Sequence, residues 1–392
     1  MPTALFTCLQ RPPGSARRAC SAPPAHRARR ARRAPSHGVS LVELMIGLVL
    51  GLVVTLVVAQ VLSFAEGQKR ITSGGSDAQV NGALALYTLQ RELQMAGYGL
   101  TGDQAALGCP IQAKLGDSGA AFNWALAPVT ITDGANGAPD QITILSASRP
   151  FSVPMLVTVD HAKAGDRFVV RAPIGVAVGD LLIAVPDGYA AATNWCTAFN
   201  VSSIAGTNQL VHANGASAPW NQAGASSIMP AAGYPAGTTL VNAGQLINRS
   251  FGVSATNALR QRTLNLATAA SDEQELFPQV VNLQALYGKD TNNDGVVDTY
   301  DTTTPTTNAL WRQVLAIRLA VVARSAHYDK NEITTAEPQW NVGTSATVAG
   351  AATCGTSNCL TLKVDGLADW KHYRYTVFDV VAPLRNLLWG GS

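Results

Sequence analysis

The sequence lacks the short motifs by which many hydrolases and nucleotide-binding enzymes are identified. It contains no HExxH zinc motif, no P-loop and no GxSxG nucleophile turn. The GDSG stretch at Ser118 matches the core of the chymotrypsin-like nucleophile motif, but that family needs a histidine earlier in the chain. The only histidines before Ser118 are His26 and His37, both in an arginine-rich N-terminal segment. We therefore expect Ser118 to lie in a turn, and we expect no catalytic residues and no enzymatic activity.

The first 38 residues lack Asp, Glu and Lys but contain eight arginines. Such a segment is typical of a disordered basic arm, of a mitochondrial transit peptide or of a leader before an apolar stretch. We favour a cleaved leader over residues 1–38, because an apolar run follows directly. Removing eight arginines from the 28 Lys+Arg leaves 20 against 25 Asp+Glu, a net charge of −5. This balance removes the electrostatic support for nucleic-acid binding by the mature chain.

The apolar run that follows contains a single charged side chain. Residues 39–64 form a 26-residue stretch in which Glu43 is the one ionisable group. At about 1.5 Å per residue, a helix of this length covers about 39 Å, enough for a bilayer core of about 30 Å. We predict a transmembrane helix with the arginine-rich side in the cytoplasm and the rest of the chain outside it. A carboxylate inside such a span is costly and usually functional.

The residues around this acid resemble a known signal. Gly38-Val39-Ser40-Leu41-Val42-Glu43-Leu44 is similar to the class III signal of type IV prepilins and type II secretion pseudopilins. The resemblance implies that a prepilin peptidase cuts after Gly38 and methylates the new N-terminus at Val39. It also implies that Glu43, at the fifth mature position, pairs with the terminal amine of a neighbouring subunit. Val39 departs from the Phe that the family usually has at this position. The alternative is an ordinary signal anchor that contains a Glu.

A second resemblance lies beyond the span. Apolar residues at helical spacing predict that the helix continues over residues 65–98, outside the membrane. The stretch 79–99 resembles the PilW family of pilus assembly proteins, and the residues that carry this resemblance are Gln79, Asn81, Leu89, Arg91, Glu92, Ala96, Gly97 and Tyr98. The segment Leu384-Arg385-Asn386 is similar to the end of PilW-like chains.

This resemblance implies a minor pilin that helps to initiate, prime or cap a type IV pilus within a complex of minor pilins. The implied partners are other minor pilins and pilin subunits, the prepilin peptidase and the inner-membrane assembly machinery. The implied location is the inner membrane, as a single-pass precursor with a periplasmic head, and then the pilus fibre or its tip. Two alternatives stay open: a type II secretion pseudopilin of the J type, and a membrane-anchored periplasmic enzyme or ligand-binding protein.

Residues 99–392 form a head that is rich in Gly, Ala, Thr and Val, with many turn signals. Strand-like runs cover 141–145, 155–159, 167–172, 180–185 and 208–213, and a loop-like stretch covers 214–237. Residues 309–325 favour a helix that turns into a strand. The expected fold class is α+β, with a long N-terminal pilin helix, membrane-spanning in its first half, that carries a large β-rich head of one or two lobes.

Four of the six cysteines lie in this head: Cys109, Cys196, Cys354 and Cys359. An even number of cysteines outside the cytoplasm predicts disulfides, and four cysteines allow three connectivities. The short CGTSNC segment favours pairing Cys354 with Cys359, which leaves Cys109 with Cys196. The alternative, a four-cysteine zinc site, lacks the CxxC pairs typical of such sites.

The segment DTNNDGVVDTYD, residues 290–301, has the spacing of a twelve-residue calcium loop. The candidate ligands are Asp290, Asn292, Asp294, the Val296 carbonyl, Asp298 and Asp301, with Gly295 at the turn position. Asp at the twelfth position is shorter than the usual Glu, which predicts weak binding. Calcium is therefore a candidate ligand, although no cofactor is required. The alternative is a solvated Asx-rich turn between strands.

Overall fold

The computed structural model describes residues 38–100, 103–115, 121–148, 153–215, 218–221, 228–265 and 270–389. It divides the chain into two units, Met1–Ser63 and Phe64–Ser392. The arginine-rich leader up to residue 37 and the GDSG stretch lie outside the described residues.

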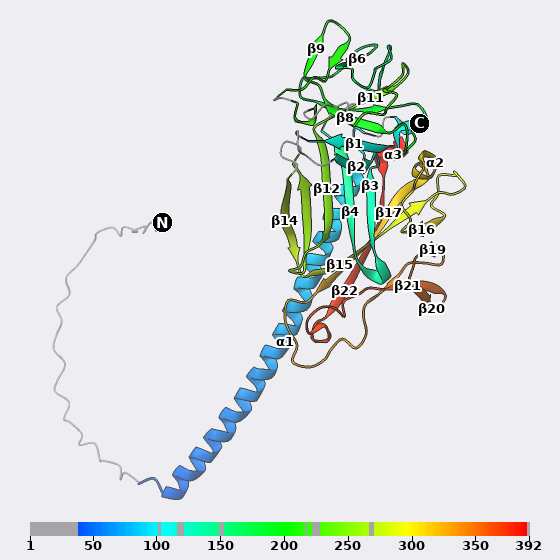
Figure 1. Cartoon of the computed structure of the whole chain (residues 1–392). Helices are drawn as coiled ribbons and strands as arrows, with labels where there is room; N and C mark the ends of the chain where they lie inside the picture. The colour runs from blue at the N-terminus through cyan, green and yellow to red at the C-terminus, as the bar shows by residue number, and fades with distance from the viewer. Residues whose placement is uncertain are drawn as a thin grey trace, which may run out of the picture. The chain divides into compact units, whose positions relative to one another are not determined.

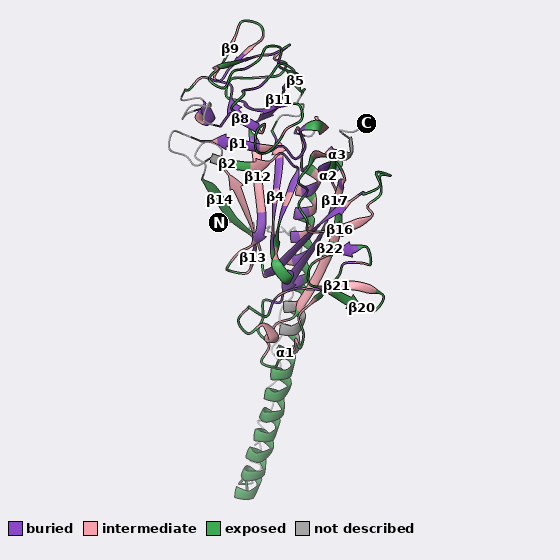
Figure 2. Ribbon diagram, turned by 45° about the vertical axis from the view of Figure 1, so that its right-hand side comes forward, coloured by how far each residue is buried: buried purple, intermediate pink, exposed green. Residues whose placement is uncertain are grey.

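The first unit contains the beginning of helix α1 (Leu41–Met95). An 18-residue window within Leu41–Gly67 has a mean hydropathy of 2.7. No residue of this segment is buried, as Figure 2 shows. The segment contains no proline, and a helix satisfies its backbone polar groups internally, as hydrocarbon requires. By length and composition, this is one helix that can span a membrane in the described part of the chain.

In the second unit, the rest of α1 packs on the head along one face. Ala85, Leu89 and Leu93 are fully buried there, at the four-residue spacing that places side chains on one side of a helix. Gly82 lies on the same face. A Cβ atom at this position would come within 2.2 Å of the Phe378 ring in strand β22 (Tyr375–Pro383). The missing side chain therefore permits the close approach of helix and sheet.

Two five-stranded sheets form the part of the head that contacts α1 (Figure 1). The first is antiparallel throughout and has the order β14 (Ser271–Pro278), β13 (Ala258–Leu264), β12 (Leu246–Val253), β4 (Ala138–Ala147) and β3 (Val129–Gly134). The second has the order β19 (Ala346–Thr347), β16 (Thr299–Asp301), β15 (Val280–Lys289), β17 (Val314–Arg324) and β22. Ile142, Phe251 and Ile317 represent the core that both sheets share with α1.

Strands β4 and β12 are hydrogen-bonded neighbours, with Ala147 opposite Leu246, although residues 148–245 separate them in sequence. This intervening segment supplies seven short strands: β5 (Met155–Leu156), β6 (Arg167–Val169), β7 (Leu181–Val185), β8 (Cys196–Asn200), β9 (Ser203–Ala205), β10 (Gln209–Val211) and β11 (Thr239–Gly244). With β1 (Pro110–Lys114) and β2 (Ala121–Ala125), they form the sheets β2-β1-β8-β7-β11-β5 and β6-β10-β9. Phe168, Phe199 and Tyr234 lie in a separate core of this segment.

The remaining elements are short. Strands β18 (Gln339–Asn341), β21 (Ser357–Thr361) and β20 (Ala351–Cys354) form a second three-stranded sheet. The short helices are η1 (Gln104–Ala106), η2 (Ala135–Gly137), η3 (Pro219–Asn221), α2 (Asn308–Arg312), η5 (Trp370–His372) and α3 (Arg385–Trp389). The expected α+β class, an apolar N-terminal helix with a large β-rich head, is confirmed.

Local sequence patterns located several of these elements. The run 141–145 lies within β4, and the run 180–185 contains the whole of β7. Residues 309–325 contain most of α2 and then β17, as expected. The run 155–159 is a strand only at Met155–Leu156, because beyond it the chain leaves β11 and Val157 forms an isolated bridge with Val170.

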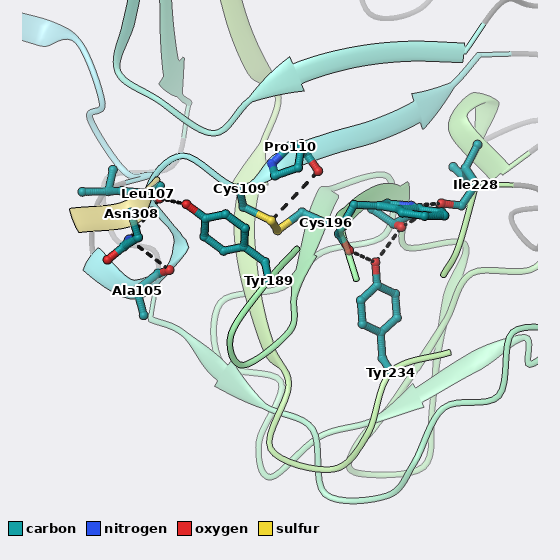
Figure 3. Close-up of a disulfide and its surroundings, with 11 residues drawn as sticks. Ala105, Leu107, Cys109, Pro110, Tyr189, Cys196, Ile228, Tyr234 and Asn308 are labelled. Atoms are coloured by element: carbon teal, nitrogen blue, oxygen red, sulfur yellow. Dashed lines mark hydrogen bonds between the residues drawn. A yellow bond between two sulfur atoms is a disulfide. The ribbon is translucent and has the colours of Figure 1, made fainter. Parts of the chain in front are cut away.

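Two disulfides link Cys109 to Cys196 and Cys354 to Cys359. The first joins residues 87 apart in sequence and fastens the start of β1 to β8, beside the Tyr189 hydroxyl that donates to the Leu107 carbonyl (Figure 3). The second closes the turn between β20 and β21. A cross-link over the longer separation removes more freedom from the unfolded chain and stabilises the fold by a few kcal/mol.

Asp140 of β4 is a buried acid that joins the two large sheets. One carboxylate oxygen accepts from the Gly134 amide and the other from the Ala285 amide of β15, each at 2.7 Å. Burial raises the pKa of Asp140 to about 7, and the two amides only partly offset this effect. The folded head therefore binds this proton more tightly than the unfolded chain does.

This raised pKa predicts a pH-dependent stability. The stabilisation from neutral Asp140 is complete below its unfolded value near 3.8 and is lost as the pH rises through about 7. We expect the free energy of unfolding to fall by up to roughly 4 kcal/mol over this range, at about 1.4 kcal/mol per pKa unit. Urea unfolding of the full chain in detergent, at several pH values, measures this slope. Asp140→Asn should lose the slope, and Asp187→Asn, at an exposed Asp outside this contact, should keep it. Parallel profiles for all three proteins would contradict the assignment.

Candidate assembly site on the N-terminal helix

Gly38 and Val39 precede helix α1, and Glu43 lies in its first turn. A carboxylate there is favoured by the partial positive charge of the helix N-terminus. Around it, Leu41, Val42 and Leu44 are all exposed. Glu43 has no ion pair or side-chain hydrogen bond with any residue that the structure describes. A cation that neutralises it would therefore have to come from outside the described part of the chain.

Farther along, α1 has a second exposed apolar face. Val80, Leu84, Tyr87 and Met95 are between 47% and 63% exposed. At 100° per residue they lie on the side opposite Ala85, Leu89 and Leu93. We call these four residues the outer stripe. The helix is thus apolar both where it meets the head and where it faces away from it.

The PilW-like residues at the end of α1 fasten the helix to the head. Glu92 forms an ion pair of 2.9 Å with Arg249 of β12. Gly97 has a φ of +74°, which suits glycine, and its amide donates to the Leu145 carbonyl at 2.7 Å. The Asn386 side chain donates to the Ala96 carbonyl at 2.9 Å, so the C-terminal segment caps this helix end. Their observed contacts are structural.

Among the other PilW-like residues of the stretch 79–99, some are buried and some are exposed. Leu89 and Ala96 are buried, Tyr98 is half-buried, and its carbonyl accepts from the Ala147 amide at 2.7 Å. Gln79 and Arg91 are exposed. The sequence resemblance thus marks a stretch in which buried contacts to the head alternate with exposed groups.

The segment 290–301 connects β15 and β16, and its carboxylates are bonded within the loop. Asp290 accepts from the Asp294 amide at 3.1 Å and from the Gly295 amide at 2.7 Å. Asp294 in turn accepts from the Val296 amide at 2.8 Å, and Asp298 accepts from Thr291 and Asn292. These contacts give the segment the form of an Asx-rich turn.

Asp301, the candidate at the twelfth position, lies in β16 and forms a 2.7 Å ion pair with Lys289. It would have to leave this lysine to bind a metal. Across the described residues, no group of three or more His, Cys, Asp or Glu side chains is placed to hold a metal ion. Calcium binding by Asp290, Asn292, Asp294, Val296, Asp298 and Asp301 stays a prediction.

A buried histidine pair escaped the sequence analysis because 51 residues separate its members. The Nε2 atoms of His161 and His212 lie 2.8 Å apart, and the His161 ring stacks on Phe168 at 3.9 Å between centroids. Burial and the neighbouring His161 lower the pKa of His212 to about 4, and burial also lowers the pKa of His161. Both rings are therefore neutral near pH 7 and share one proton between their Nε2 atoms. This arrangement is that of core histidines.

Comparison with known proteins gives one match. Residues 246–386 match the family model PilW, described as Type IV Pilus-assembly protein W. The matched segment begins at β12 and ends within α3, so it includes Arg249 and Asn386 but not α1. No curated protein and no solved structure matches the chain. The family match relates the chain to type IV pilus assembly.

Calcium binding by the segment 290–301 can be tested directly. Extracellular loops of this kind bind calcium at roughly 10⁻⁴–10⁻³ M, and calcium at about ten times the dissociation constant stabilises a protein by about 1.4 kcal/mol. We expect millimolar calcium to raise the melting temperature of the full chain in detergent and Asp294→Ala to abolish the rise. Asp365→Ala, at an exposed Asp elsewhere, should keep it. An equal shift in Asp294→Ala and the unaltered protein, or no shift in either, would leave the loop a polar turn.

Proposed function

We propose that this chain, whose residues 246–386 match the PilW family model, is a minor pilin that helps to initiate, prime or cap a type IV pilus. The observation that carries the proposal is that the two parts of α1 have different surroundings. Its first part is an exposed apolar span with one acid, and its last part fastens to the head while keeping the outer stripe exposed. Such a helix has one face for its own head and further apolar surface for the helices of other subunits.

In this proposal, Glu43 forms the ion pair that joins one subunit to the next. A carboxylate surrounded by apolar side chains is stable in hydrocarbon only when a positive group meets it, because an unpaired buried charge costs several kcal/mol. A peptidase cut after Gly38 would create a free amine at Val39, four residues before Glu43. In an assembly of staggered helices, the amine of one subunit can neutralise the carboxylate of the next. The chain then acts through assembly and not through catalysis.

The partners in this proposal are other minor pilins and pilin subunits. The outer stripe provides a helix–helix contact in which Val80, Leu84 and Tyr87 follow the spacing of a packing seam. The prepilin peptidase and the inner-membrane assembly machinery act earlier, on the membrane-inserted precursor. The head then lies in the periplasm, where its two disulfides are stable, before the chain enters the fibre or its tip.

Processing is the first test of this function. We expect the mature protein, purified from a strain with an active prepilin peptidase, to begin at Val39. Mass spectrometry of the N-terminal peptide reads both the cut and any methyl group. A strain without the peptidase should retain residues 1–38. A mature start anywhere except Val39 would remove the prepilin assignment.

Assembly is the second test. Glu43→Ala removes a carboxylate from the span, so insertion should be unchanged or easier. Incorporation into sheared pili should fall about tenfold or more, because losing one partner of a buried ion pair typically costs about 3–5 kcal/mol. Immunoblots of membranes and sheared pili measure the two steps. Glu66→Ala, an exposed acid of the same helix, is the matched control and should assemble normally. Equal incorporation of Glu43→Ala and the unaltered protein would refute the pairing.

A further inference from the structure

The sheet β14-β13-β12-β4-β3 has one apolar and one polar face. Ile142, Ile144 and Phe251 point into the core that the sheet shares with α1. The opposite face bears a hollow of about 410 Å³, bordered by Asn123 and Trp124 of β2. Its position on a rigid sheet gives the hollow a defined shape.

A row of side chains crosses the floor of this hollow. The strand register places Thr130 opposite Thr143, Thr143 opposite Ser250, and Ser250 opposite Arg262. All four residues line the hollow. Neighbouring strands lie about 4.8 Å apart, so three hydroxyl groups follow one another at this interval.

The groups along this row are free to bind a ligand. The hydroxyls of Thr130, Thr143 and Ser250 make no hydrogen bond with any described residue, and the same holds for the side-chain amides of Gln141 and Asn248. Each hydroxyl donates one hydrogen bond and accepts others, and each amide does both. The floor is therefore dense in unused donors and acceptors.

The hollow carries little net charge. Arg262 is the one charged residue among those that line it, and Glu273 of β14 accepts from its guanidinium in an ion pair. A nucleic acid would require several unpaired cations. A membrane would require an apolar surface, and an extended peptide adds to the edge of a sheet and not to its face.

An aromatic ring completes the wall. Trp124 is half-buried at the border of the hollow, and its ring meets that of buried Trp220 in an edge contact of 6.0 Å between centroids. Trp220 thus holds the ring of Trp124 in place. An indole presents an apolar surface against which the C–H groups of a ring-shaped ligand can pack.

We propose that this hollow binds a neutral carbohydrate, a short oligosaccharide whose hydroxyls bond to the row Thr130–Thr143–Ser250 and to the amides of Gln141 and Asn248. One sugar ring packs against Trp124. Neutral polyhydroxylated rings match all three features of the hollow: many donors and acceptors, little net charge and one aromatic wall. The site lies wholly in the second unit and uses no residue of the proposed assembly helix, so it stands or falls independently of the minor-pilin function.

The test uses the full chain in lauryldimethylamine oxide, a detergent without a sugar headgroup. The probes are maltotriose, cellotriose and chitotriose, titrated to about 10 mM by calorimetry, with sialyllactose as an anionic probe. We expect at least one neutral trisaccharide to bind. Trp124→Ala removes the ring against which the sugar packs. The affinity for the trisaccharide should therefore fall about tenfold or more, which corresponds to about 1.4 kcal/mol.

A second variant separates recognition from folding. Thr143→Val with Ser250→Ala removes two hydroxyls and keeps the sheet's shape, so the melting temperature should change little while the affinity falls about tenfold. Tyr328→Ala, at an exposed aromatic elsewhere, is the control and should bind as the unaltered protein does. The proposal is overturned if no neutral trisaccharide binds, if only sialyllactose binds, or if neither the Trp124 nor the Thr143 variant weakens binding.

Discussion

The packing of α1 on the two five-stranded sheets is the constraint on which the rest of the second unit depends. Full burial of a leucine side chain contributes about 1.5–3 kcal/mol, and Leu89 and Leu93 are both completely buried in this contact. Gly82 lets the helix approach Phe378 so closely that any larger residue would push the two apart. Because the sheets occupy one face of α1, the outer stripe is left facing away from the head.

Polar contacts then fix where the helix stops. The Gly97 amide bonds to β4, Glu92 pairs with β12, and Asn386 caps the helix from the C-terminal segment. Three parts of the chain, distant in sequence, therefore meet at one helix end. Since β4 and β12 adjoin there, the whole segment 148–245 can leave and rejoin the sheet without disturbing α1. The disulfide between Cys109 and Cys196 fastens that segment to β1.

The sequence predicted the features that depend on neighbouring residues. Hydropathy and helical spacing located α1, and the short cysteine spacing indicated the Cys354–Cys359 pair. The strand order could not be predicted from the sequence, because nothing within β4 specifies β12 as its neighbour. The row of Thr130, Thr143 and Ser250 exists only through that pairing. Asp301 shows the same limit: its spacing fits a calcium loop, but the pairing of β16 with β15 places it beside Lys289.

Several polar groups of the head have their partners within the chain. Inside the head, buried Asp140 accepts two amides, the buried histidines bond to each other, and Asp301 is neutralised by a lysine. Glu43, among exposed apolar side chains, has no such partner within the described residues, and neither do the hydroxyls and amides of the polar hollow. In an apolar surrounding, the Glu43 carboxylate costs free energy unless a cation neutralises it. The hydroxyls and amides of the hollow can form hydrogen bonds with water. A ligand gains binding free energy there only if its own groups replace those hydrogen bonds. In the proposed roles, assembly is therefore obligatory for the helix, while ligand binding by the head is reversible.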